Sequence, residues 1–348
     1  MTDRPIYVIA EMAYSHDGSV ALARDIVAKA AEAGADAISV HFTHMPDYMV
    51  RHYGAGPGRV SAGKDVKPVY DYLVEISLSF DSWRDVVAAV RETSLDLIVM
   101  PNDGASLEFA ETLSPDAYVL SAACFEEHDF IRRVGGAGRP VYLRVGGATL
   151  GEIETVIGVL KDCGAEEQIL LYGHQNYPTG PADTNLAALT RLKQAFDLPV
   201  GIAEHVDAEE DFALIAPLLA IPMGIVAIEK HLTHDRGKRG EDFESALNVD
   251  EFALLVKRIR LAESAIGEGA IGTDESSAAY RRNVRKRLVA ARAIRKGEII
   301  TDDMIAAKRA DEGVSPARRA ELVGRAAAAN IETDAGLTLD LTTAGKGS

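Results

Sequence analysis

The stretch PVGIAEHVDAEEDFALIAPLLAIPMGIVAIEKHLTHDRGKRGED, residues 199–242, decides the fold of this chain. Two apolar runs within it, 200–203 and 225–228, have the length and the β-branched content of buried strands. Each run is followed by charged residues and a histidine, His205 after the first and His231 after the second. A segment of helical length, 209–220, lies between them, so the stretch predicts a β-α-β unit with one imidazole near the carboxyl end of each strand.

The same unit repeats along the chain before this stretch. Helical segments are expected at 105–113, 127–134, 149–162, 183–195 and 209–220, with others from Ser19, Pro68 and Ser82 and a last one at 249–266. Apolar strands are expected at 6–13, 37–42, 95–100, 117–122, 141–145, 168–172, 200–203 and 225–228. Eight strands alternating with helices predict an α/β fold, a closed (β/α)8 TIM barrel over residues 1–266.

The pattern changes at Gly267. Residues 267–287 combine a glycine-rich segment with a basic run at 281–287 and indicate a linker. We expect the basic run to bind acidic surface of the chain or of a partner subunit. Short strands and a Lys296-Gly297-Glu298 turn then predict a small second domain over 288–348.

Charge and composition exclude several classes of protein. The net charge of −16 and the absence of a basic stripe argue against a nucleic-acid partner. Two cysteines without metal-ligand spacing argue against a disulfide framework. The amino-terminal segment does not resemble a signal peptide, and no apolar run approaches the ~20 residues that span a membrane. We therefore expect a cytoplasmic protein that does not contact membranes.

The glycine-rich residues 54–58 have neither phosphate-loop nor dinucleotide spacing and indicate a loop.

Chemically active side chains gather where the predicted strands end. They are Glu11, His41, His44, Asn102, Asp103, Arg144, His174, Gln175, Glu204, His205, Lys230, His231 and His234, and they include six of the nine histidines. In a TIM barrel these ends converge on one mouth, where the catalytic groups sit. His205 and His231 together form a candidate divalent-metal site. Glu11 ends an apolar strand, where a carboxylate needs a partner or a metal. Arg144 is either a salt-bridged structural residue or a clamp for a carboxylate or phosphate.

Several motifs give the chain a close resemblance to the sialic acid synthase family. Those of the barrel are Ile9-Ala10-Glu11 with His16-Asp17-Gly18, AGADA at 33–37, Tyr177-Pro178, GIAEH at 201–205, IEKHLT at 228–233 and GED at 240–242. The C-terminal domain resembles that family's antifreeze-like (SAF) domain through IRKGE at 294–298 and Lys308-Arg309. The resemblance runs nearly from end to end.

The resemblance implies a function and a set of roles. The family condenses phosphoenolpyruvate with an N-acylated hexosamine to give a sugar acid, using Mn²⁺, Mg²⁺ or a similar ion. It implies that His205 and His231 bind the metal, that Glu11 is catalytic and that Tyr177 and Asp242 contact the sugar. It also implies a domain-swapped homodimer, in which Arg309 of the capping domain enters the partner's active site.

The donor side departs from the family pattern. Where the family has two phosphoenolpyruvate-binding lysines, this chain has Ser39 and Val119. Where the family has serines, it has Ala122, Arg144 and Ala203, and where the family has an asparagine, it has Gln175. Our first hypothesis is a metal-dependent enzyme that forms or breaks a carbon–carbon bond, acting on a sugar-like aldehyde and a small anionic co-substrate through an altered donor pocket. A second is a metal-dependent isomerase, epimerase or lyase in which His41, His174 or Lys230 moves protons. A third is a non-catalytic sugar-binding homologue.

Overall fold

The structure, a computed structural model, describes residues 5–53, 68–267 and 269–344. The expected loop at 54–58 lies outside the described residues. The chain divides into two compact units, Met1–Ile266 and Gly267–Ser348. No described helix combines the length and the apolar character that crossing a bilayer requires.

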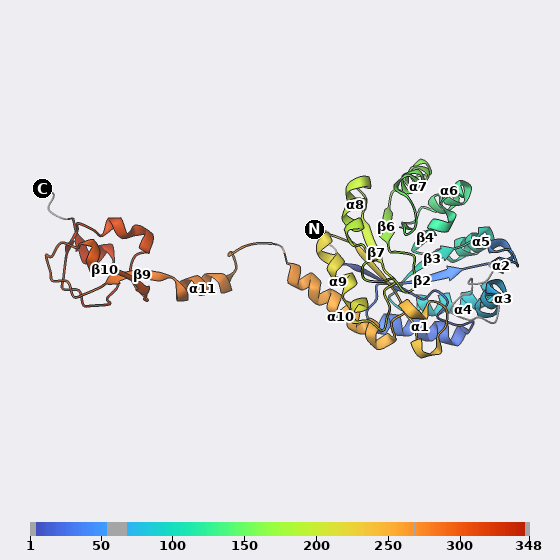
Figure 1. Ribbon diagram of the computed structural model, residues 1–348, viewed down its shortest axis with the longest axis horizontal. Helices are drawn as coiled ribbons and strands as arrows, with labels where there is room; N and C mark the ends of the chain where they lie inside the picture. Colours follow the sequence, from blue (N-terminus) through green and yellow to red (C-terminus); the bar gives the residue numbers. More distant parts are fainter. Residues whose placement is uncertain (1–4, 54–67, 268, 345–348) are drawn as a thin grey trace. The chain divides into compact units, whose positions relative to one another are not determined.

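Unit 1 is a closed parallel barrel, which confirms the predicted fold class (Figure 1). Its described strands pair in chain order, and the last closes onto the first with Glu11 opposite His231. They are β1 Tyr7–Glu11, β2 Ala37–Phe42, β3 Asp96–Pro101, β4 Ala117–Ser121, β5 Val141–Arg144, β6 Gln168–Tyr172, β7 Val200–Ala203 and β8 Ala227–His231.

Helices surround this barrel between successive strands (Figure 1). They are α1 Val20–Glu32, α2 Met45–Tyr48, α3 Val69–Ile76, α4 Phe80–Arg91, α5 Gly104–Leu113, α6 His128–Gly135, α7 Leu150–Asp162, α8 Ala187–Phe196, α9 Ala216–Ala220 and α10 Val249–Ile266. Side-chain caps begin several of them; Thr149 and Glu152, for example, form a capping box at the start of α7.

Two elements of the deciding stretch differ from expectation. The helix expected at 209–220 is a 3₁₀ turn, Asp211–Leu214, followed by the short α9. Pro217 lies in the first turn of α9, and a proline inside a longer helix would remove a backbone hydrogen bond and clash with the preceding turn. The last strand runs to His231 rather than ending at Ile228, because its ladder with β1 continues to that residue.

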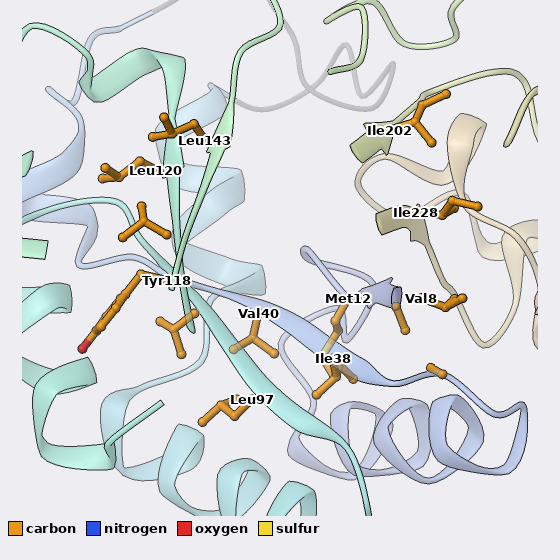
Figure 2. Close-up of a cluster of buried hydrophobic side chains, with 14 of the residues drawn as sticks. Val8, Met12, Ile38, Val40, Leu97, Tyr118, Leu120, Leu143, Ile202 and Ile228 are labelled. Atoms are coloured by element: carbon orange, nitrogen blue, oxygen red, sulfur yellow. The ribbon is translucent and has the colours of Figure 1, made fainter. Parts of the chain in front are cut away.

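Side chains of the strands alternate between two cores. Outward-facing residues pack against the helices, and those labelled in Figure 2 include Val8, Ile38, Leu143 and Ile228. Inward-facing residues fill the barrel: Ile9, Ala37, Ile98, Met100, Ala117, Val119, Tyr142, Leu171, Ala203 and Ala227. This alternation determines which residues near the carboxyl ends of the strands point into the mouth.

Unit 2 has its own small core and antiparallel pairs. β9 Lys286–Ala290 pairs with β10 Ile305–Arg309, and β11 Ala326–Ala327 pairs with β12 Thr342–Thr343. The segment expected to be a linker contains a helix, α11 Glu275–Val284, which begins where the Asp274 side chain accepts a hydrogen bond from the Ser277 amide. The basic run therefore forms the last turn of α11 and the start of β9.

Candidate active site at the mouth of the barrel

Glu11, Arg144 and Glu229 meet inside the barrel near its carboxyl-terminal end. Each lies two residues beyond an inward-facing apolar residue of its own strand, so alternation turns all three side chains inward. Arg144 crosses from β5 to β1, where its Nη2 donates to Glu11 Oε2, and the same nitrogen lies 2.9 Å from Glu229 Oε1. The exposed fractions of these side chains are only 12% for Arg144, 0% for Glu11 and 1% for Glu229. One guanidinium is therefore shared by two buried carboxylates.

The two carboxylates differ in their electrostatic surroundings. Burial alone would raise the pKa of Glu11, but the charge of Arg144 and the contact with His41 outweigh it and lower that pKa overall. Burial also raises the pKa of Glu229, and there the opposing attraction of Arg144 does not compensate. Arg144 approaches Glu229 as an ion pair at 2.9 Å, and no other described residue donates a hydrogen bond to either Glu229 oxygen. Glu11 is therefore held ionised, whereas the Glu229 carboxyl retains a proton more readily.

His41 completes this cluster from β2. Its Nε2 lies 3.2 Å from Glu11 Oε1 and 3.3 Å from Arg144 Nη1. In one neutral tautomer this nitrogen donates to Glu11, and in the other it accepts from Arg144. His41 is therefore placed to carry a proton to or from Glu11.

The two metal-candidate histidines lie beside each other at the ends of β7 and β8, with ring centroids 5.3 Å apart. His205 Nδ1 lies 2.9 Å from the His174 carbonyl oxygen, which accepts its hydrogen. Burial, followed by the neighbouring His231, lowers the pKa of His205 to about 3, so its ring is neutral. Its Nε2 is then a free base, which currently accepts from the Tyr177 hydroxyl at 3.0 Å. A neutral imidazole fixed through its other nitrogen is the usual form of a metal ligand, so these residues fit a divalent ion.

Asp242 and Tyr177 border the histidine pair. Asp242 Oδ2 lies 3.7 Å from His231 Nε2. Burial would raise the pKa of Asp242, but its contact with His231 lowers that pKa overall. The Tyr177 hydroxyl also lies 3.3 Å from Gln175 Oε1, whose side chain is exposed. A carboxylate and a phenol that face the histidine pair can bind the hydroxyl groups of a polar substrate.

Two of the predicted site residues of unit 1 do not place their side chains in this cluster. Lys230 lies two residues after outward-facing Ile228, so its side chain also faces outward. It is completely buried and donates to Glu204 Oε1 at 2.6 Å. The prediction that Lys230 moves protons in the mouth conflicts with this placement, since adjacent residues of a strand face opposite sides. His174 contributes its backbone carbonyl, while its ring is exposed. Arg309 lies at the exposed end of β10 in unit 2.

Glu229 is a residue of the site that was not predicted, although the sequence contains a signal for it. Glu229 is two residues before His231, so any strand that turns His231 inward also turns Glu229 inward. Ser39, one of the two positions where the resemblance implies a lysine, lies opposite Glu11 in the β1–β2 ladder and also faces inward.

A second group of possible metal ligands, His44, Asp47 and Asp103, has a structural explanation. Asp103 caps α5 by accepting from the Ser106 amide, and its other oxygen accepts from the His44 amide and the Ser106 hydroxyl. Both oxygens of this carboxylate are therefore used by protein donors.

Comparisons with known proteins agree with this architecture. A family model described as "NeuB family" matches residues 26–271, and one described as "SAF domain" matches residues 285–341. The chain is 28% identical over 332 residues to a pseudaminic acid synthase of Campylobacter jejuni, covering 95% of each protein. It is 26% identical over 329 residues to an N,N'-diacetyllegionaminic acid synthase of the same species, covering 94% of this chain and 97% of the relative. The crystal structure of an N-acetylneuraminic acid (sialic acid) synthetase from Leptospira borgpetersenii has the same fold, with a TM-score of 0.69, 24% identity and coverage of 81% of this chain and 93% of that one.

Proposed function

The chain belongs to the NeuB family, and from this membership we propose that it is a metal-dependent enzyme joining a sugar-like aldehyde to a small enol or enolate donor through a new carbon–carbon bond. The observation that carries the proposal is the convergence of an ionised Glu11, the His205–His231 pair and Asp242 on one barrel mouth. Relatives named as sugar acid synthases over nearly their whole length support an enzyme of this kind.

Each residue of the mouth has a role in this reaction. His205 and His231 would hold the divalent ion, Mn²⁺, Mg²⁺ or a similar one, which when bound polarises the aldehyde oxygen. Tyr177 and Asp242 hold the hydroxyl groups of the sugar-like substrate. Glu11 and His41 move protons at the donor side, since they are in contact there.

We also propose that phosphoenolpyruvate-dependent synthesis is weak or absent. The described barrel strands carry two cationic residues, Arg144 and Lys230, of which Lys230 pairs with Glu204 on the outer side. Arg144 is shared by Glu11 and Glu229, so it offers at most one positive charge to a multiply charged phosphate. Burying a phosphate without further cations is unfavourable. Titration calorimetry with phosphoenolpyruvate and Mn²⁺ tests this: micromolar binding, with turnover of N-acetylmannosamine, would contradict it.

Assembly and location extend the proposal. We propose a cytoplasmic homodimer in which Arg309 enters the active site of the partner subunit. The exposed guanidinium of Arg309 has no hydrogen bond or ion pair within the described residues, so it is available for such a contact.

Removal of the metal tests the central proposal. We expect the purified protein to retain about one divalent ion per chain, measured by elemental analysis, and to lose it with chelator. His205→Ala and His231→Ala should each weaken metal binding, whereas His44→Ala, which alters the other candidate group, should not. Carbon–carbon bond formation between N-acylated hexosamines and enol donors should stop when the ion is removed. Full activity after thorough metal removal would refute the metal role.

A further inference from the structure

Four polar atoms inside the barrel have no hydrogen-bond partner among the described residues. They are Ser39 Oγ, Arg144 Nε and both carboxyl oxygens of Glu229, of which Oε1 has only its ion pair with Arg144. Ser39 is completely buried, and all three residues occupy inward positions on β2, β5 and β8. An unpaired buried polar atom is costly, so such atoms gathered in one place mark a site where a ligand completes the hydrogen bonding.

The chemistry of these atoms restricts the ligand. The N–H of Arg144 and the hydroxyl of Ser39 can both donate, which suits a carboxylate. Glu229, if protonated, donates to a neighbouring keto oxygen, and if ionised it accepts from an enol hydroxyl. The site therefore matches a carboxylate with an oxygen on the adjacent carbon.

The charge of the ligand distinguishes between two donors of this shape, an enol phosphate and an unphosphorylated 2-oxo acid. An enol phosphate would bring a multiply charged group next to Glu229 and Glu11, where the described strands add only Arg144 as an inward cation. Like charges in a buried site repel strongly. An unphosphorylated 2-oxo acid brings a single negative charge, which Arg144 can hold.

We propose that the donor bound by Arg144, Ser39 and Glu229 is an unphosphorylated 2-oxo acid of the pyruvate type, which the enzyme uses as its enolate. This inference rests on the proposed carbon–carbon bond-forming function and names its donor class. In the free protein Arg144 neutralises Glu11. The unpaired Nε–H of the same guanidinium remains available for the substrate carboxylate.

The chemistry balances without phosphate, water or a redox partner. Glu11 takes a proton from C3 of the 2-oxo acid, and the C–H electron pair forms the C2–C3 double bond while the carbonyl electrons move to the C2 oxygen. The C2 oxygen lies next to Glu229. Carbon C3 of the enolate then bonds to the aldehyde carbon, the C2 carbonyl reforms, and the aldehyde oxygen takes up the proton that Glu11 removed. The product is a 4-hydroxy-2-oxo acid.

Exchange of the pyruvate methyl hydrogens tests the donor without knowledge of the sugar. Full-length protein is incubated with pyruvate and Mg²⁺ in D₂O, and incorporated deuterium is read by mass spectrometry. We expect exchange well above that with Mg²⁺ alone, and a fall of about 100-fold or more in Glu11→Gln. Pyruvamide, which lacks the carboxylate charge, should exchange at least about tenfold more slowly in the unaltered protein.

Variants of Arg144 identify the clamp. Arg144→Ala and the charge-conserving Arg144→Lys should each raise the pyruvate concentration for half-maximal exchange by about tenfold or more. Arg133→Ala is the matched control, because Arg133 also contacts two glutamates, Glu108 and Glu111, but on the outer surface. It should leave exchange unchanged. The pyruvamide comparison does not depend on whether an Arg144 variant folds.

The outcomes separate this inference from the proposed function. Absence of pyruvate exchange, or exchange that persists in Glu11→Gln, overturns the donor assignment. Phosphate release from phosphoenolpyruvate together with a sugar aldehyde also overturns it, while leaving the carbon–carbon bond-forming function intact. Exchange that persists after metal removal supports the donor assignment, because the divalent ion is proposed to act on the aldehyde oxygen and not on the 2-oxo acid.

Discussion

His16 is a buried imidazole next to the mouth whose titration should be visible in stability. The ring is 1% exposed, its Nδ1 accepts from the Gly18 amide at 3.2 Å, and its edge meets Trp83. Burial, and to a lesser degree His41, lowers the pKa of His16 from 6.5 to about 4. Below pH 6.5 the unfolded chain therefore binds a proton that the native protein does not. The free energy of unfolding should fall as pH decreases from 6.5 towards 4.

We predict that His16→Asn makes the stability less dependent on pH. The asparagine oxygen can still accept from the Gly18 amide but does not titrate. Between about pH 7 and pH 4.5 the loss in free energy of unfolding should be smaller by about 2 kcal/mol in the variant, measured by denaturant titration. His52→Asn, at an exposed histidine, is the control. Parallel curves for His16→Asn and the unaltered protein would show that His16 does not titrate in this way.

At the scale of elements, a buried ion pair joins β7 to β8 behind the two histidines. Lys230 donates to Glu204 Oε1 at 2.6 Å, and Glu204 Oε2 accepts from the Val206 amide at 2.6 Å. The exposed fraction is 0% for the Lys230 side chain and 2% for the Glu204 side chain, so the pair is separated from water. Because Glu204 precedes His205 and Lys230 precedes His231, the pair holds the metal-candidate histidines in register.

Removal of one member of this pair should destabilise the barrel. Lys230→Met leaves Glu204 buried without a counter-charge and should cost about 3–5 kcal/mol in the free energy of unfolding. The double variant Lys230→Met/Glu204→Gln should recover part of this loss, since it removes the stranded charge and keeps an acceptor for Val206. Denaturant titration of the two variants measures both values. A double variant that is less stable than Lys230→Met would contradict the argument.

Close packing between neighbouring strand ends gives a second prediction at this scale. A Cβ added at Gly173, after β6, would lie 1.6 Å from the Ala203 carbonyl oxygen of β7. Gly173→Ala should therefore destabilise the protein by at least about 3 kcal/mol or prevent folding. Gly158→Ala is the matched control within α7, where an added Cβ meets nothing within 4 Å. That change should stabilise by about 0.5–1 kcal/mol, as judged by thermal denaturation.

At the scale of the whole molecule, the proposed role of Arg309 can be tested with mixed subunits. If Arg309 acts in the partner's mouth, a dimer of Arg309→Ala and Glu11→Ala subunits contains one site that has both residues intact. When the two inactive variants are mixed, each mixed dimer should have up to about half of the activity of the unaltered dimer. Labelled subunits would first establish exchange by native mass spectrometry. Exchange without any recovery would contradict the crossing of Arg309.

The sequence determined the barrel because its signals are local. Apolar runs of strand length, β-branched residues, and glycine or capping residues at element ends specify strands and helices wherever they occur. The position of Glu11, His205 and His231 at strand ends follows from the same signals, since a charged residue ends an apolar run. Where a local rule was overlooked, as with Pro217 inside the expected helix at 209–220, the prediction was wrong although the information was present.

Only the tertiary structure determined which side chains of the site contact one another. The contact of Glu11 with Arg144 joins residues 133 positions apart and exists because the barrel closes β8 onto β1 and leaves β5 facing them. The role of Arg144, left open between a structural ion pair and a clamp, depends on Glu229 and Glu11 sharing its guanidinium. Lys230 and His231 are adjacent in the sequence, yet they serve different layers, because the pleat of β8 turns one into the helix layer and the other into the mouth. Such pairings arise from closure and sidedness, which no single segment of the chain encodes.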